Sequence, residues 1–165
     1  MGLYSELNEL WRSRPEELKV LLRERRILWR REPSVVRVER PLRLDRARGI
    51  GYKAKQGFVV LRVRVRRGGF SKPRPNSGRR PKAIGAVLHK VNVTMAEEAI
   101  NRARKKYPNL HPIGCYPLTY DSLYKWFEVI LVDPYHPAIR SDPEIQLPDP
   151  LRRRVERRLM REKSH

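Results

Sequence analysis

Apolar residues recur at helical spacing in the first third of the chain. Residues 3–11 predict an amphipathic helix, because one face collects Leu3, Leu7, Leu10 and Trp11. The segment Ser13-Arg14-Pro15-Glu16 is typical of a capping box, with Pro in the first turn of the helix that follows. We expect this second helix to run to about Arg31, before Pro33. Its expected apolar stripe consists of Leu18, Leu21, Leu22, Leu28 and Trp29.

Strict alternation of apolar and basic residues predicts a β-strand over residues 59–66. One face of this strand consists of Val59, Leu61, Val63 and Val65. The other face consists of Val60, Arg62, Arg64 and Arg66. Neighbouring like charges destabilise a sheet, and that segment holds no acid, so the ladder of arginines favours a polyanion as partner. The alternative is a sheet face that only meets solvent.

Further along, Thr94-Met95-Ala96-Glu97 is typical of a capping box, and a helix is expected to follow it to about Tyr107. Residues 86–93 are expected to form a strand. Residues 110–118 contain two prolines and predict a short edge strand. The most hydrophobic run, 123–132, predicts a central strand. We expect residues 37–56 to be irregular and the proline-rich residues 134–150 to form a linker.

The charge of the chain points to nucleic acid. Of 165 residues, 38 are Lys or Arg, 28 of them Arg, against 18 Asp or Glu, so the formal net charge is +20. Arg forms bidentate contacts with phosphate and stacks on bases. Ion-pair networks of the thermophilic kind are the alternative, but 18 acids cannot pair 38 bases.

Cysteine content and hydropathy exclude several other classes of protein. Cys115 is the only cysteine, which excludes an intramolecular disulfide and fits an intracellular protein. The first ten residues carry acids where a secretory signal carries bases, and no apolar run approaches a membrane span. We therefore expect neither a signal peptide nor a membrane partner.

Two further segments hold candidate contacts to nucleic acid. Residues 70–82 are rich in proline and lack acids, so we expect an extended loop that lies along a polyanion. Its cations are Lys72, Arg74, Arg79, Arg80 and Lys82. Before the strand, Lys53 and Lys55 are expected to reach phosphates, while Tyr52 either stacks on a splayed base or packs in the core. Arg67 extends the arginine ladder.

The acidic, histidine and glycine residues of the sequence disfavour a catalytic role. Asp121, Glu128 and Asp133 surround one predicted strand, as a metal-dependent nuclease would require, but Glu128 and Asp133 are expected on opposite faces. The histidines lack the spacing of metal ligands, and no glycine-rich phosphate loop is present.

Two long motifs resemble a known family. GYKAKQGFVVLRVRVRRGG at 51–69 and YKWFEVILVDPYHPAIRSDPEIQ at 124–146 are similar to the archaeal and eukaryotic "fifteen-e" family of large-subunit ribosomal proteins. Arg40-Pro41 followed by Asp45-Arg46-Ala47-Arg48 resembles it too. The resemblance covers roughly residues 1–147, and we expect residues 148–165 to be a short Arg-rich extension.

The resemblance implies a single α+β domain over residues 1–147, with a small, mostly antiparallel sheet, packed helices and basic extended loops. It implies a structural constituent of the large subunit that binds ribosomal RNA beside neighbouring ribosomal proteins, without catalysis, cofactor, metal or small-molecule substrate. It favours a cytoplasmic protein of archaeal source. The alternative is a chromatin-like protein that compacts nucleic acid. The expected RNA-binding residues are Arg43, Arg46, Arg48, Tyr52, Lys53, Lys55, Arg62, Arg64, Arg66, Arg67, Lys72, Arg74, Arg79, Arg80 and Lys82.

Overall fold

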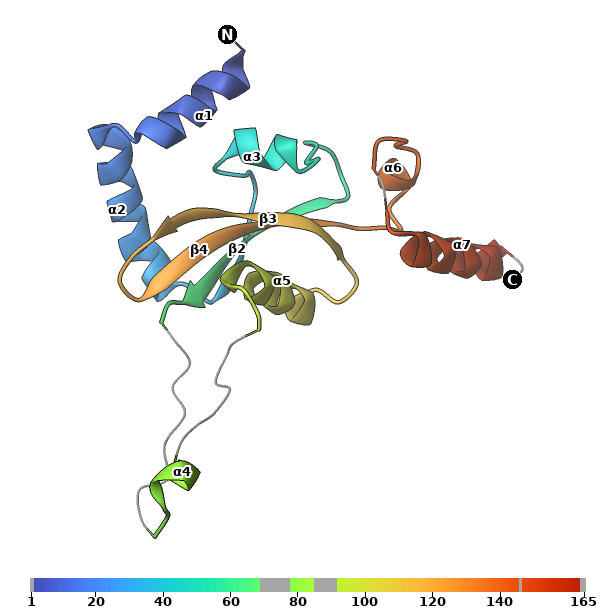
Figure 1. The fold of residues 1–165 in the computed structure, drawn as a ribbon. Coiled ribbons are helices and arrows are strands. Elements are labelled where there is room, and N and C mark those ends of the chain that lie inside the picture. The colour runs from blue at the N-terminus through green and yellow to red at the C-terminus, as the bar shows by residue number, and fades with distance from the viewer. Residues whose placement is uncertain (1, 69–77, 85–91, 146, 164–165) are drawn as a thin grey trace.

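An antiparallel sheet of four strands lies at the centre of the protein (Figure 1). The structure, a computed structural model, describes residues 2–68, 78–84, 92–145 and 147–163. The strands are β1 (Val35–Val38), β2 (Phe58–Arg66), β3 (His111–Tyr120) and β4 (Tyr124–Val132). Their order across the sheet is β1-β2-β4-β3, so β2 and β4 are interior and β1 and β3 form the edges. The expected α+β class is confirmed.

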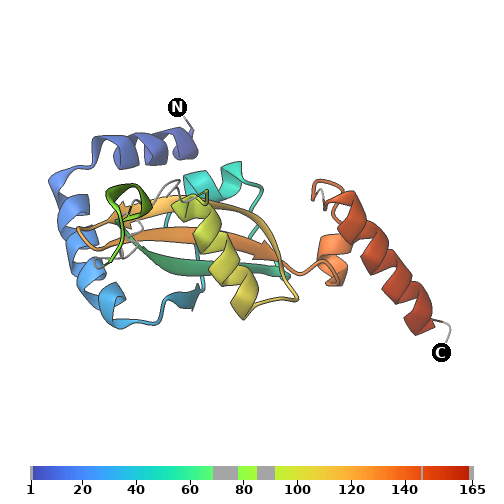
Figure 2. The same cartoon turned by 60° about the horizontal axis from the view of Figure 1, so that its bottom comes forward.

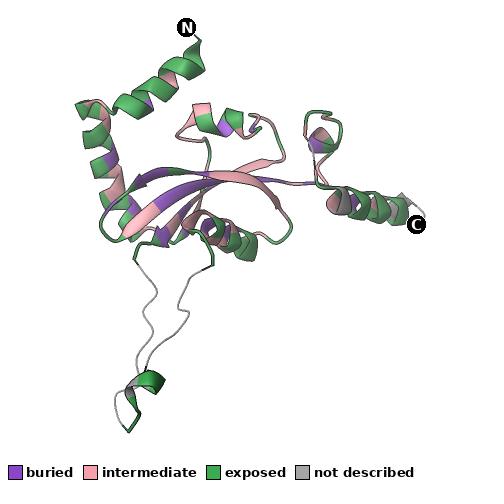
Figure 3. Ribbon diagram, viewed as in Figure 1, coloured by how far each residue is buried: buried purple, intermediate pink, exposed green. Residues whose placement is uncertain are grey.

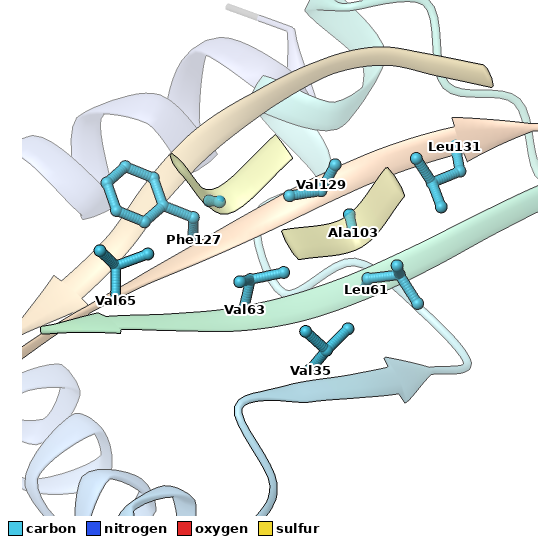
Figure 4. Close-up of a cluster of buried hydrophobic side chains, with 9 residues drawn as sticks. Val35, Leu61, Val63, Val65, Ala103, Phe127, Val129 and Leu131 are labelled. Atoms are coloured by element: carbon cyan, nitrogen blue, oxygen red, sulfur yellow. The ribbon is translucent and has the colours of Figure 1, made fainter. Parts of the chain in front are cut away.

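One face of the sheet is covered by helix α5 (Met95–Lys106). The predicted capping box begins this helix: the Thr94 hydroxyl accepts from the Glu97 amide at 3.2 Å, and the Glu97 carboxylate accepts from the Thr94 amide at 2.8 Å. Ala99 and Ala103 are fully buried, and their small side chains let the helix approach the strands closely. The cluster beneath α5, shown in Figure 4, comprises Val35, Leu61, Val63, Val65, Ala99, Ala103, Phe127, Val129 and Leu131.

The opposite face is covered by helices α2 (Glu16–Arg31) and α3 (Leu44–Gly49). Figure 1 shows α3 and α5 on opposite sides of the sheet. The ring centroids of Trp29 and Trp126 are 6.1 Å apart at the centre of this second layer. Its buried residues are Trp29, Ala47, Tyr52, Val60, Tyr116, Leu118, Trp126 and Ile130. Both faces of the sheet are therefore packed, including the face from which the arginines of β2 project.

Helices α1 (Leu3–Ser13) and α2 bury only part of the apolar stripes that the sequence predicts. Trp11, Leu22 and Trp29 are buried, whereas four other members of the two stripes are exposed: Leu3, Leu10, Leu21 and Leu28. Figure 3 shows most of α1 and much of α2 as exposed surface. Each helix contacts the rest of the protein along one side only, so the wider stripes are not all covered.

The capping box predicted before α2 is wrong. Ser13 is the last residue of α1, and its hydroxyl donates to the carbonyl of Leu10 at 3.3 Å. Pro15 instead occupies the N-cap position of α2, without a side-chain hydrogen bond. Arg14 between the helices has a φ of 49°, the left-handed conformation that ends α1. The predicted end of α2 at Arg31 is confirmed.

Helix α3 and the second half of β1 lie within residues 37–56, which the sequence predicts to be irregular. β1 pairs with β2 from Val35 opposite Val63 to Val38 opposite Val60. α3 follows and buries Ala47 completely. Both elements are too short for a periodic pattern, and pairing with β2 and packing on the sheet stabilise them. The prediction of an irregular segment is therefore wrong for these residues.

The remaining strand predictions have mixed outcomes. β4 is an interior strand, as the hydrophobic run indicates, and β3 lies at an edge. β3 spans ten residues and is longer than expected, because register shifts between Pro112 and Gly114 and between Pro117 and Thr119 accommodate its prolines. The strand expected at 86–93 falls largely outside the described residues; Asn92 and Val93 are not in a strand.

The C-terminal segment folds into helices α6 (Pro137–Arg140) and α7 (Asp149–Lys163). The first of these lies inside the stretch predicted as a linker. Val155 of α7 is buried and shares a cleft with Ile139 and Leu147. Figure 2 shows α7 beyond the end of the sheet that lies farthest from α2. The arginine-rich end of the chain therefore forms an amphipathic helix that packs on the segment after β4.

Candidate nucleic-acid interface

The arginines of β2 have different surroundings along the strand. Arg62 is the most enclosed: 12% of its side chain is exposed, it pairs with Glu32 at 2.5 Å, and its guanidinium lies 4.4 Å from the Trp29 ring centroid. Arg64 lies over Tyr124 at 4.6 Å and donates to a backbone carbonyl at the end of α2. The end of α2 therefore largely encloses Arg62, which contacts Glu32 and Trp29 within the protein.

Acids compensate this arginine ladder, although none lies in β2 itself. Glu32 follows α2, and Glu128 is opposite Arg62 on β4. Glu128 is buried; it accepts a hydrogen bond from the Tyr116 hydroxyl at 2.6 Å and another from the Leu42 amide at 2.9 Å. Burial raises the pKa of Glu128 above its usual value. Glu32 and Glu128 therefore offset, at Arg62, the repulsion between like charges that the sequence predicts for this strand.

Arginines become exposed toward the C-terminal end of β2. Arg66 and Arg67 are both exposed. The guanidinium of Arg67 lies 4.9 Å from the Tyr120 ring centroid and donates to the Asp121 carbonyl. A guanidinium held over a ring keeps its N–H edges available to an anion and loses little freedom on binding. This end of the sheet therefore presents oriented cations.

Of the three arginines at α3, Arg43 is partly buried, whereas Arg46 and Arg48 are exposed. Arg43, 12% exposed, pairs with Asp45 at 2.7 Å and lies 4.9 Å from the Trp11 ring centroid. Arg46 and Arg48 are exposed on the helix. Arg43 thus ties α1 to α3, whereas Arg46 and Arg48 are available to a partner.

The segment before β2 is engaged within the protein. Tyr52 is buried and packs edge-on against Phe58, with ring centroids 5.6 Å apart. Of the two alternatives, base stacking and core packing, the structure shows core packing for this side chain. Lys53 pairs with Asp142 at 2.7 Å, and Lys55 pairs with the same carboxylate. These hydrogen bonds hold the pKa of Asp142 well below its usual range. The two lysines clamp this segment to the residues after α6.

The basic loop is described only in part. Lys72 and Arg74 lie outside the described residues. Arg79 and Arg80 are exposed, as is Lys82 in the short helix α4 (Pro81–Ile84). Figure 1 shows α4 well away from the sheet. These three cations therefore lie apart from the core, in residues 78–84, which we call the arm.

Several exposed cations were missed by the sequence-based choice of residues. They lie on α7, at the end of α5 and on α2, and include Arg153, Arg154, Arg104, Lys105, Arg23 and Arg31. Helical periodicity could have predicted that these cations are exposed. On α7, for example, the arginines surround an apolar stripe of Leu151, Val155 and Leu159. The exposed cationic surface is thus wider than the residues chosen from sequence.

The acids near β4 have structural surroundings. Asp121 accepts from the Leu123 amide at 2.8 Å and pairs with Arg30 at 2.7 Å, which shapes the turn between β3 and β4. Asp133 accepts from the Tyr135 amide at 2.9 Å in the turn after β4. In the part of the chain that the structure describes, no three His, Cys, Asp or Glu side chains gather where they could hold a metal ion. None of the helices in the described ranges combines the length and apolar composition that a membrane crossing requires.

The described part of the chain is thus a small α+β protein that pairs many of its acids internally and exposes arginines along several elements. A comparison with protein families defines it further. The family described as Ribosomal L15, of the L15e type, matches residues 2–163. The chain belongs to this family of large-subunit ribosomal proteins. The match continues through α7, beyond the roughly 147 residues over which the sequence analysis found a resemblance.

Proposed function

We propose that the protein is a structural constituent of the large ribosomal subunit that binds and stabilises large-subunit ribosomal RNA. The observation that carries this proposal is the set of exposed guanidiniums on a chain of this family, at the end of β2, on α3 and on the arm. The side chains concerned are Arg46, Arg48, Arg66, Arg67, Arg79 and Arg80, with Lys82.

The surroundings of these groups suit contact with phosphate. Arg67 is oriented over Tyr120, and the neighbouring Arg64 over Tyr124, so two guanidiniums are positioned before RNA arrives. Side chains ordered in the free protein lose less conformational entropy when they bind. In contrast, Arg62, Lys53 and Lys55 already have carboxylate partners, so phosphate would have to compete for them.

The proposal extends to setting and partners. The protein would act in cytoplasmic ribosomes of an archaeal source, in contact with neighbouring ribosomal proteins and with no cofactor or small-molecule substrate. An arm such as that carrying Arg79 and Arg80 suits the irregular cavities of folded RNA. No described feature favours compaction of DNA over this role.

Binding measured across salt concentrations tests the proposal. The purified chain would be titrated with transcribed large-subunit RNA, small-subunit RNA and duplex DNA from about 50 to 200 mM salt, the range over which phosphate contacts weaken steeply. With ~8 phosphate contacts, the slope of log affinity against log salt is expected to be about −6 to −7. Large-subunit RNA should bind most tightly. A slope near zero, or equal affinity for duplex DNA, would contradict the proposal.

A further inference from the structure

A cleft opens between α1, α3 and β3, away from the exposed end of β2. Its volume is about 590 Å³, within the range of small-ligand sites. Figure 1 shows α1 and α3 on the same side of β3. A Cβ added to Gly114 of β3 would lie 2.7 Å from Cγ2 of Ile50, so this edge strand runs close beneath the end of α3. The cleft therefore results from the packing of three elements and is more than a gap beside one loop.

Two buried polar atoms at this cleft lack a partner. Asp45 and Arg43 both line it. Oδ2 of Asp45 pairs with Arg43, but Oδ1 of Asp45 and Nε of Arg43 have no hydrogen-bond partner in the described part of the protein. Only 5% of the Asp45 side chain is exposed. An unpaired buried carboxylate oxygen is costly, so an acceptor and a donor left unpaired on two ion-paired residues that line a cleft favour a ligand that carries both groups.

The remaining lining supplies an aromatic ring, an amide and an exposed cation. Tyr4 of α1 is 46% exposed, and Asn8 is one helical turn further along the same helix. Arg46 lines the cleft and is exposed at its rim. Proteins bind unpaired bases by stacking on rings and by hydrogen bonds from amide and carboxylate groups to the base edges. The cation at the rim suits the phosphate attached to such a base.

We propose that this cleft binds one unpaired nucleobase of the RNA, with Tyr4 stacking on the base and Asp45, Arg43 and Asn8 hydrogen bonding to its edge. The inference rests on the proposed RNA-binding function and adds a site that recognises a base beside the surface that recognises phosphates. The Watson–Crick edge of every base carries a donor next to an acceptor, which matches the unpaired Oδ1 of Asp45 and Nε of Arg43. Arg46 contacts the phosphate of the same nucleotide.

The test is a titration followed by backbone amide shifts in NMR spectra of the full 19.6 kDa chain. The probes are the four nucleoside 5′-monophosphates, with ribose 5-phosphate as the control that lacks a base. At least one nucleotide should shift the amides of α1, α3, Cys115 and Tyr116 in a saturable way, and ribose 5-phosphate should not. Absence of such shifts with all four nucleotides, or equal shifts with ribose 5-phosphate, would overturn the inference.

Variants separate stacking from hydrogen bonding. Tyr4→Leu keeps apolar bulk but removes the ring, and should weaken nucleotide binding about fivefold or more, the weaker end of what one stacked base contributes. Asp45→Asn should also weaken it. Asn101→Ala removes an exposed amide on α5, outside the cleft, and should leave binding unchanged. Because about half of Tyr4 is exposed, Tyr4→Leu remains informative even if Asp45→Asn does not fold.

The two experiments distinguish an error in the base-binding inference from an error in the proposed function. If nucleotides leave the cleft unaffected while large-subunit RNA still binds with a steep dependence on salt, only the base-binding site is wrong. If RNA binding also lacks a dependence on salt, the proposed function is wrong as well.

Discussion

Replacing Arg62 by Gln should destabilise the protein more than it weakens RNA binding. Sequence alone places Arg62 in a ladder with Arg64 and Arg66, but the structure gives it internal partners in Glu32 and the Trp29 ring. The substitution removes a guanidinium that joins α2 to the middle of the sheet. Its main effect should therefore fall on the free energy of unfolding.

The size of the effect follows from these contacts. A largely desolvated cation over a tryptophan ring contributes about 0.5–2 kcal/mol. A hydrogen bond to a charged group contributes about 1.5–3 kcal/mol. Glu32 is itself 35% exposed, so water solvates its carboxylate after the change and the second contribution is reduced. We expect a loss of about 2 kcal/mol in the free energy of unfolding.

Urea denaturation followed by far-UV circular dichroism measures this loss without interference from the altered surroundings of Trp29. Arg66→Gln is the matched control, since it is the same substitution on the same strand at an exposed position. It should change the free energy of unfolding by less than about 0.5 kcal/mol. It should also lower RNA affinity and reduce the salt slope by about one unit.

The opposite pattern would refute this reasoning. If Arg62→Gln is as stable as the unaltered protein and weakens RNA binding as much as Arg66→Gln does, Arg62 is a phosphate contact. Its pairing with Glu32 would then contribute nothing to the fold.

Three further predictions concern other parts of the molecule. Val63→Asp places an unpaired carboxylate at a fully buried position and should unfold the domain, seen as loss of the cooperative thermal transition; a folded variant would contradict the core assignment. The triple change of Arg79, Arg80 and Lys82 to Gln should lower RNA affinity in filter binding while the urea midpoint stays the same, and unchanged affinity would count against the arm. Asp142→Asn should lower the urea midpoint at pH 7, because the carboxylate with its lowered pKa stabilises the fold above its unfolded pKa of about 3.9. That contribution is lost as pH falls below about 4, so a difference between the two proteins that persists undiminished at pH 2 would contradict the clamp.

The elements that the sequence predicts well are those whose pattern is local. Alternation over residues 59–66 gives β2 and its buried face, and the capping box at Thr94 gives the start of α5 within one residue. The hydrophobic run after residue 123 gives β4 as an interior strand. In each case the same residues that form the pattern also make the contacts that stabilise the element.

The surroundings of the arginines and lysines could not be predicted, because their partners are distant in sequence. Glu32 precedes Arg62 by 30 residues, and Asp142 follows Lys53 by 89. The sequence shows correctly that β2 contains no acid. It does not show that the end of α2 brings Glu32 to this strand. Likewise, Tyr52 carries no local signal that separates a base-stacking ring from a core ring.

Cross-linking of the protein to RNA within the ribosome tests the central claim most directly. Large subunits from the source cells would be irradiated with ultraviolet light, and the peptides of this chain attached to RNA identified by mass spectrometry. We predict cross-links to large-subunit RNA in peptides that contain Arg46 and Arg48, Arg66 and Arg67, or Arg79 and Arg80. Absence of the chain from salt-washed large subunits, or cross-links confined to peptides outside these three regions, would contradict the account.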